Sequence, residues 1–118
     1  MLKNKKIKDD VMYVEAAGMI TKKDVDEVKD DIDEIIKEYG KIKFAMNMDN
    51  FEGYTVDGLI ADFGMYFKYK DHMGSVALIG DKSNVEEIYL LCDKFLPDMC
   101  KLFGKDDTEK AMHWLQQV

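Results

Sequence analysis

Apolar positions along the chain switch repeatedly between strand-like runs and helical spacing. Residues 11–20, 41–48, 75–80 and 98–103 form short apolar runs bounded by glycine, proline or charged residues, which is typical of β-strands. The runs at 41–48 and 75–80 show little polar alternation, which indicates strands buried on both faces in a parallel sheet. Residues 3–10 are rich in lysine and predict at most a weak edge strand, with a frayed, solvated terminus as the favoured interpretation.

Four segments between and after these runs place apolar residues at helical spacing. In the first helix, Thr21 is the N-cap with Asp24 three residues later, and Gly40 ends the helix. Thr55 caps the second helix, which ends near His72. Each of these helices is expected to follow a strand directly.

The third helix starts at Asp81 or at Ser83, because Ser83 heads a capping-box pattern, and Pro97 stops it. A closing helix covers residues 106–118. The order β(β)αβαβαβα indicates an α/β fold with right-handed crossovers. We predict one domain over residues 1–118, with a mixed, mostly parallel sheet of four to five strands and about four helices.

The helix after Thr55 is apolar over much more than half its circumference, although a surface helix needs only one apolar face. Its predicted core stripe consists of Val56, Leu59, Ile60, Phe63, Tyr66 and Phe67. A second row beside it consists of Gly58, Ala61, Met65 and Tyr69. The residues left to meet water are Asp57, Asp62 and Lys68.

The second row has three possible roles. It packs between the sheet and a neighbouring helix, or forms a homodimer face, or lines a pocket for an apolar ligand. Gly58 and Gly64 each cost about 1 kcal/mol of helix propensity relative to alanine. Either something approaches the helix backbone closely at these glycines, or the cost is tolerated.

Charge and cysteine content limit the choice of partner and compartment. The formal net charge is −7. The only basic patch is short, lacks interleaved aromatic residues and consists of Lys3, Lys5, Lys6 and Lys8. We therefore expect no nucleic-acid binding. No apolar run approaches the ~20 residues of a membrane span, and the lysine-rich start lacks the apolar core of a signal peptide. We therefore expect a cytoplasmic protein. Cys92 and Cys100 form no CxxC pair and are interpreted as reduced, buried thiols.

The sequence contains no recognisable catalytic or metal-binding motif. The residues after Gly80 do not have the spacing of a phosphate loop, and Phe51 stands where a calcium loop needs an oxygen ligand. His72 and His113 have no metal-ligand spacing. Neither serine lies in a GxSxG pattern, and arginine is absent. We therefore predict a non-enzymatic protein without metal or cofactor.

Four segments that span almost the whole chain carry a family resemblance: "AAGMITKKDVDEV", "IKEYGKIKFAMNMDNFEGYT", "MGSVALIGDK" and "FGKDDTEKAMHWL". The chain thereby resembles the SpoIIAA-like family of small bacterial proteins, which is related in fold to STAS domains and to the CRAL-TRIO lipid-carrier fold. The resemblance implies a (β/α) superhelix, frequent dimerisation and a role in carrying or sensing non-polar small molecules. It brings no catalytic residues.

The resemblance also draws attention to Thr55. In STAS domains of the anti-sigma-factor-antagonist type, a phosphorylatable Ser or Thr begins the helix after a central strand, and Thr55 is the nearest position here, with Gly58 three residues on. The chain departs from that pattern because Tyr54 replaces the family's Asp and the strand-to-helix loop carries "NFEG". An unmodified N-cap is the alternative to a phosphorylation switch.

Two hypotheses follow. The first is a dimeric, non-enzymatic binding domain whose apolar pocket lies between the helix after Thr55 and the adjacent strand ends. The second is a regulatory, STAS-type module that binds another protein and is switched or not at Thr55. An enzyme would require polar groups that converge in a cleft.

Overall fold

The computed structural model describes residues 1–118, which form a five-stranded sheet with helices on both faces. The elements are β1 (Leu2–Lys8), β2 (Val11–Ile20), α1 (Lys22–Tyr39), β3 (Ile42–Tyr54), α2 (Val56–Tyr69), a 3₁₀ turn (Lys70–His72), β4 (Met73–Ile79), α3 (Lys82–Phe95), β5 (Cys100–Phe103) and α4 (Thr108–Gln117).

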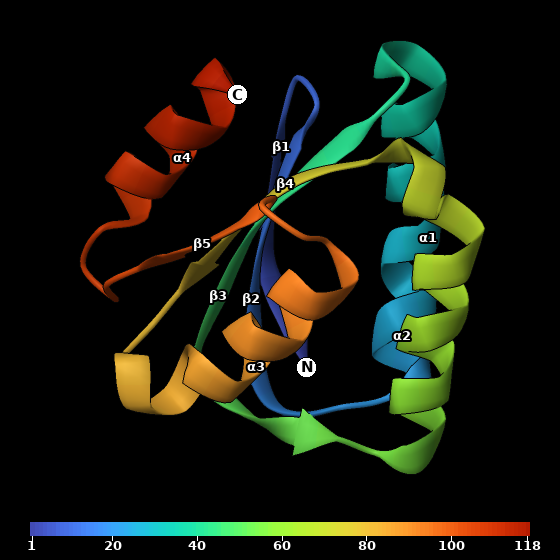
Figure 1. Cartoon of the computed structure of the whole chain (residues 1–118). Helices are drawn as coiled ribbons and strands as arrows, with labels where there is room; N and C mark the ends of the chain where they lie inside the picture. Colours follow the sequence, from blue (N-terminus) through green and yellow to red (C-terminus); the bar gives the residue numbers. More distant parts are fainter.

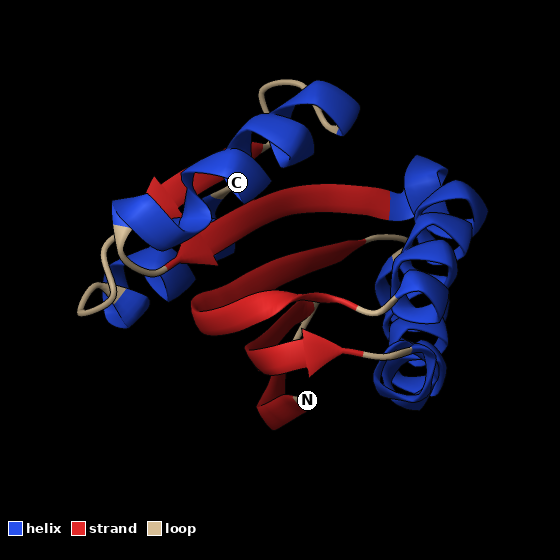
Figure 2. Cartoon of the chain, turned by 90° about the horizontal axis from the view of Figure 1, so that it is seen from below, coloured by secondary structure: helices blue, strands red, loops and turns tan.

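The strands lie in the order β1-β2-β3-β4-β5. β1 runs antiparallel to β2, and the pairs β2–β3, β3–β4 and β4–β5 are parallel. The predicted mixed, mostly parallel α/β sheet is therefore confirmed. Figure 1 shows the sheet between α4 on one side and the α1–α2 pair on the other, and Figure 2 shows the same separation after a rotation.

The two faces of the sheet carry hydrophobic cores of different size. The larger core joins strands β2, β3 and β4 to α1, α2 and α3, and includes Met12, Ile32, Phe44, Leu78 and Val85. The smaller core packs α4 on β2, β3 and β4 through Ala111 and Leu115. The face beneath α1, α2 and α3 therefore holds most of the buried apolar surface, and it is the face that contains the candidate site.

Local capping signals place α1 as predicted. The Thr21 hydroxyl accepts a hydrogen bond from the Asp24 backbone N–H at 3.2 Å, and Asp24 accepts one from the Thr21 N–H at 2.9 Å. Gly40 ends the helix in the left-handed region, with φ of 79°. Of the two starts predicted for α3, Asp81 is confirmed as the N-cap residue, and Ser83 lies inside the helix, so the capping-box pattern at Ser83 is not used.

The predicted length of β3 is wrong. β3 does not end near Met48 but continues to Tyr54, because its second half pairs with residues 17–20 of β2. The segment "NFEG" therefore belongs to a strand and is not a loop. At the N-terminus the weak edge strand that the sequence allowed is confirmed in place of a frayed end, since Leu2–Lys8 pairs with β2. Its lysines are exposed, which suits an edge that must resist pairing with other chains.

Candidate apolar ligand site

A cavity of about 220 Å³ lies between the sheet and helices α1, α2 and α3. Of the 26 residues that line it, 25 are hydrophobic, and the exception is Asp62. An engineered apolar cavity of about 150 Å³ can hold benzene, whereas pockets for drug-sized ligands start near 300 Å³. The cavity therefore has room for a small apolar molecule.

The mouth of the cavity lies between α2 and α3. Leu59 and Phe63 on α2, and Leu91 and Phe95 on α3, line the cavity and are also exposed to solvent, at 40%, 36%, 50% and 37%. Side chains that border both the interior and the solvent mark the opening of the cavity. Both helices thus contribute an apolar rim.

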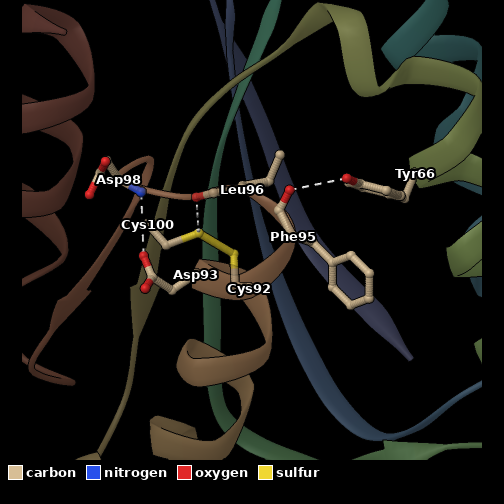
Figure 3. The surroundings of a disulfide bond; sticks show 7 residues. All are labelled: Tyr66, Cys92, Asp93, Phe95, Leu96, Asp98 and Cys100. Carbon is tan, nitrogen blue, oxygen red and sulfur yellow. Dashed lines mark hydrogen bonds between the residues drawn. A yellow bond between two sulfur atoms is a disulfide. The ribbon is translucent and has the colours of Figure 1, made fainter.

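Aromatic side chains join the two helices beside this mouth. The ring of Phe95 lies 5.9 Å from that of Phe63 and 5.4 Å from that of Tyr66, both in edge-to-face geometry. The Tyr66 hydroxyl donates a hydrogen bond to the Phe95 backbone carbonyl at 3.0 Å, which Figure 3 shows. A movement of Phe95 together with the end of α3 would therefore change the width of the mouth.

A disulfide lies at the end of α3. Cys92 on α3 and Cys100 at the start of β5 are bonded, with Cα atoms 6.4 Å apart (Figure 3). The expectation of two reduced thiols is wrong, because the turn after Pro97 folds the chain back and brings the two side chains together. Cys92 also lines the cavity, so the bond fixes the wall that carries Phe95.

Helix α2 is rotated relative to the orientation that its sequence suggested. The predicted core stripe is split, since Val56, Ile60 and Phe67 are 80%, 67% and 62% exposed. The other three stripe residues line the cavity: Leu59, Phe63 and Tyr66. In the second row, Gly58 and Tyr69 are buried and Ala61 and Met65 are half-buried. The assignment of the stripe to the core is therefore wrong for its three most exposed residues and correct in part for the rest.

The reason for this orientation is a close contact at Gly58. A Cβ atom built on Gly58 would collide with the backbone carbonyl oxygen of Ile20 at the end of β2. The hydroxyl and backbone N–H of Thr55 also donate to that same carbonyl, at 3.3 Å and 3.0 Å. Only glycine allows the first turn of α2 to come so near to the strand. No atom lies near a Cβ built on Gly64, so its helix-propensity cost is tolerated.

The structure separates the four residues of the second row. Met65 and Tyr69 line the cavity, whereas Gly58 and Ala61 do not. The Tyr69 hydroxyl donates to Asp33 on α1 at 2.5 Å, and Ala61 packs against the larger core. A ligand-binding role for the cavity-lining pair, or a dimer role for the row, stays a prediction.

Asp62 is the site residue that the sequence placed wrongly. It was expected to meet water, but it is half-buried and lines the cavity. Burial raises the pKa of its carboxyl group, although a hydrogen bond from the Tyr54 hydroxyl at 3.3 Å acts in the opposite direction. Burial and the nearby Asp62 charge raise the pKa of the Tyr54 phenol. A signal was present in the sequence, because an acid one helical turn from both Leu59 and Tyr66 interrupts an apolar face.

Thr55 serves as the N-cap of α2, as predicted. Its hydroxyl accepts a hydrogen bond from the Gly58 backbone N–H at 3.1 Å and contacts the Asp57 carboxylate at 2.5 Å. Contact with the hydroxyl keeps the pKa of Asp57 low. A phosphate on Thr55 would gain from the helix N-terminus but would stand next to this carboxylate.

The rest of the molecule shows no group of three or more His, Cys, Asp or Glu side chains placed to hold a metal ion. None of the helices has the length and apolar character needed to cross a bilayer.

These features define an α/β protein with a mixed five-stranded sheet and an apolar cavity under three helices. A family model described as SpoIIAA-like matches residues 11–116. The chain therefore belongs to the SpoIIAA-like family, as its sequence motifs indicated. No curated protein sequence matches it.

Solved structures support the same fold. An uncharacterised DUF3478-family protein with a SpoIIAA-like fold from Shewanella loihica PV-4 is 20% identical, with a TM-score of 0.76 over 98% of this chain and 92% of that one. The unphosphorylated anti-sigma factor antagonist SpoIIAA is 10% identical, with a TM-score of 0.63 over 100% and 98%. The phosphorylated Bacillus cell fate determinant SpoIIAA is 11% identical, with a TM-score of 0.58 over 98% and 97%. At these identities the likeness concerns the fold alone.

Proposed function

We propose that this protein is a non-enzymatic carrier or sensor that binds a small apolar molecule between the sheet, α2 and α3. The observation that carries the proposal is the cavity of about 220 Å³, in which 25 of 26 lining residues are hydrophobic. Pockets of this kind, preformed and apolar with one polar group, are typical ligand sites. An empty apolar cavity also lacks dispersion contacts on its inner side, which a ligand of the right size restores.

A matched pair of substitutions on α3 tests this proposal. Leu91 lines the cavity mouth, whereas its neighbour Leu90 is 61% exposed and does not line the cavity. Leu91→Lys should weaken the binding of toluene, measured by titration calorimetry, because a charge at the mouth must be desolvated as the ligand enters. Leu90→Lys adds the same charge and should leave toluene binding unchanged. Equal effects of the two substitutions would count against the cavity as the binding site.

Protein purified from its own host offers a second test. Native mass spectrometry before and after denaturation should reveal a small molecule that leaves when the cavity is lost. Consistent absence of such a molecule, together with no binding of toluene by the wild type, would contradict the proposal.

A second candidate function is the docking of a protein on the outer face of α2. The observation that favours it is the row Val56, Ile60 and Phe67, since large apolar side chains aligned on one exposed helix face often mark an interface. The occupant is a regulatory protein, as expected of a STAS-type module, or a second copy of this chain. The net charge of −7 favours a basic partner over an acidic one.

Ile60→Lys separates this candidate from the first, because Ile60 belongs to the outer face and does not line the cavity. The substitution should abolish a dimer detected by sedimentation, or a partner captured in a pull-down, while ligand binding persists. Pull-down with Thr55→Glu tests the phosphorylation switch. Equal capture by wild type and Thr55→Glu would remove the switch from the account.

A further inference from the structure

The cavity wall contains very few polar atoms, and most of them are already used. Its three tyrosines place hydroxyl groups at the edge of the apolar space. Tyr66 donates to the Phe95 carbonyl at 3.0 Å, and Tyr69 donates to Asp33 at 2.5 Å. These two hydroxyl protons are directed to protein acceptors. The third tyrosine, Tyr54, donates to Asp62.

Asp62 is the one carboxylate among the lining residues, and most of its capacity to accept hydrogen bonds is unused. Its Oδ2 atom accepts the 3.3 Å bond from Tyr54, while Oδ1 accepts none from the protein and is not fully shielded from solvent. A carboxylate can accept about four hydrogen bonds. None of the ion pairs in the structure includes Asp62. A half-buried acid therefore borders an apolar space with one long hydrogen bond and no counter-charge.

Such a group is unfavourable in the empty protein. Partial burial of a carboxyl group costs free energy unless hydrogen bonds or an opposite charge compensate it. Leucine at this position would complete the apolar wall, as at Leu59 one turn earlier. A bound molecule with a donor group would give Oδ1 a direct hydrogen bond in place of its partial contact with solvent.

We propose that Asp62 is the polar anchor of the ligand site, and that the ligand is a small amphiphile with an apolar body and one hydrogen-bond-donating head, an amine or an alcohol. This inference rests on the proposed function of the cavity. The apolar body occupies the space beneath α2 and α3, and the head donates to Oδ1 of Asp62. Tyr54 holds the carboxyl group in place through Oδ2.

The same geometry disfavours a ligand with a carboxylate head. Two carboxylates at one site are both acceptors and repel each other, so one of them must take up a proton. An ammonium head gains an ion pair in a partly desolvated setting, and a hydroxyl head gains a hydrogen bond to a charged acceptor. The site should therefore rank amine and alcohol heads above the acid for an identical body.

Four benzene-sized probes test the ranking, since an apolar cavity of about 150 Å³ already holds benzene. Benzylamine, benzyl alcohol, benzoate and toluene share one ring and differ in the head. We expect the wild type to bind benzylamine and benzyl alcohol roughly tenfold or more tightly than benzoate, the difference that a charge-assisted hydrogen bond produces. Affinities are measured by calorimetry at neutral pH.

Two asparagine variants complete the experiment. Asp62→Asn keeps the shape of the side chain and removes its charge, so benzylamine should lose roughly tenfold in affinity and benzoate should no longer be disfavoured. Asp71→Asn is the control, because Asp71 is exposed just after α2 and does not line the cavity. It makes the same change in net charge and should preserve the wild-type ranking. Circular dichroism confirms that both variants fold.

The outcomes distinguish a failure of the Asp62 anchor from a failure of the cavity as a ligand site. If toluene binds but the heads make no difference, or if Asp62→Asn and Asp71→Asn behave alike, the role of Asp62 is overturned while the cavity remains a ligand site. If none of the four probes binds the wild type, the proposed function fails and the anchor fails with it.

Discussion

The hydroxyl of Tyr66 on α2 donates a hydrogen bond to the backbone carbonyl of Phe95 on α3 at 3.0 Å. Both residues line the cavity, and their rings are 5.4 Å apart in edge-to-face geometry. The bond therefore joins the two helices that form the cavity mouth. Opening the mouth requires this contact to break or to move with α3.

Tyr66→Phe tests this contact, because it keeps the ring and removes the hydroxyl. We expect a small loss of stability, about 0.5 kcal/mol, since the bond is exposed and water replaces it readily. Amide hydrogen exchange should become faster at the end of α3, around residues 92–96, and stay unchanged in α4. Unchanged exchange at the end of α3 would show that the bond does not hold the mouth.

The two glycines of α2 should respond in opposite directions to alanine. Gly64→Ala is expected to raise the free energy of unfolding by up to about 1 kcal/mol, because no atom lies near the added methyl group and alanine favours the helix. Gly58→Ala should lower it by roughly 1–3 kcal/mol, because its methyl group would meet the Ile20 carbonyl. Urea unfolding of both variants and of the wild type measures the two changes in the free energy of unfolding. A stabilised Gly58→Ala would contradict the packing of α2 against β2.

Asp62 makes stability depend on pH. Its folded-state pKa lies above the ordinary value of 3.8, so its contribution to stability is present below 3.8 and is lost as pH rises through the raised pKa. Asp62→Asn should therefore be more stable than the wild type near neutral pH, and this advantage should shrink as pH falls toward the ordinary value. The facing phenol of Tyr54 stays neutral across this range.

Urea unfolding at several pH values, from about pH 4 to about pH 7, measures the difference between the two proteins. The control is Asp71→Asn, which should follow the wild type. A wild type that exceeds Asp62→Asn in stability at neutral pH would mean that the buried charge is already compensated, and the need for a ligand donor would disappear.

Reduction should loosen the α3 wall of the cavity. The Cys92–Cys100 bond closes a short loop, with a sequence separation of 8, and loop-closure entropy for such a loop corresponds to about 2–3 kcal/mol. A thiol reductant should lower the melting temperature of the wild type and leave a Cys92→Ser, Cys100→Ser double variant unaffected. Two free thiols in the folded, unreduced protein would contradict the pairing.

Structural features that depend on residues close together in the sequence were predicted correctly. The caps at Thr21 and Gly40 are local, and so is the alternation of strands and helices that defines the fold class. The length of β3 was underestimated, because its second half is held by pairing with β2 and not by its own apolar pattern. The disulfide was missed because it depends on the turn that brings β5 beside α3.

The candidate site was predicted only in part, because some of its features depend on contacts between residues that are distant along the chain. The excess of apolar residues on α2 was visible, and Met65 and Tyr69 do line the cavity. The sequence could not show which face turns inward, because a contact with the backbone of Ile20, distant along the chain, decides it. Asp62 was assigned to water on its charge alone.

Uptake of an apolar molecule by the cavity can be followed directly at the methionines. Of the nine methionines, five line the cavity: Met12, Met46, Met48, Met65 and Met73. The four outside it are Met1, Met19, Met99 and Met112. Titration of methyl-labelled protein with toluene, followed by NMR, should shift the five cavity signals in a saturable way and leave the other four in place. Absence of a saturable shift in the five signals, or equal shifts in all nine, would contradict uptake by the cavity.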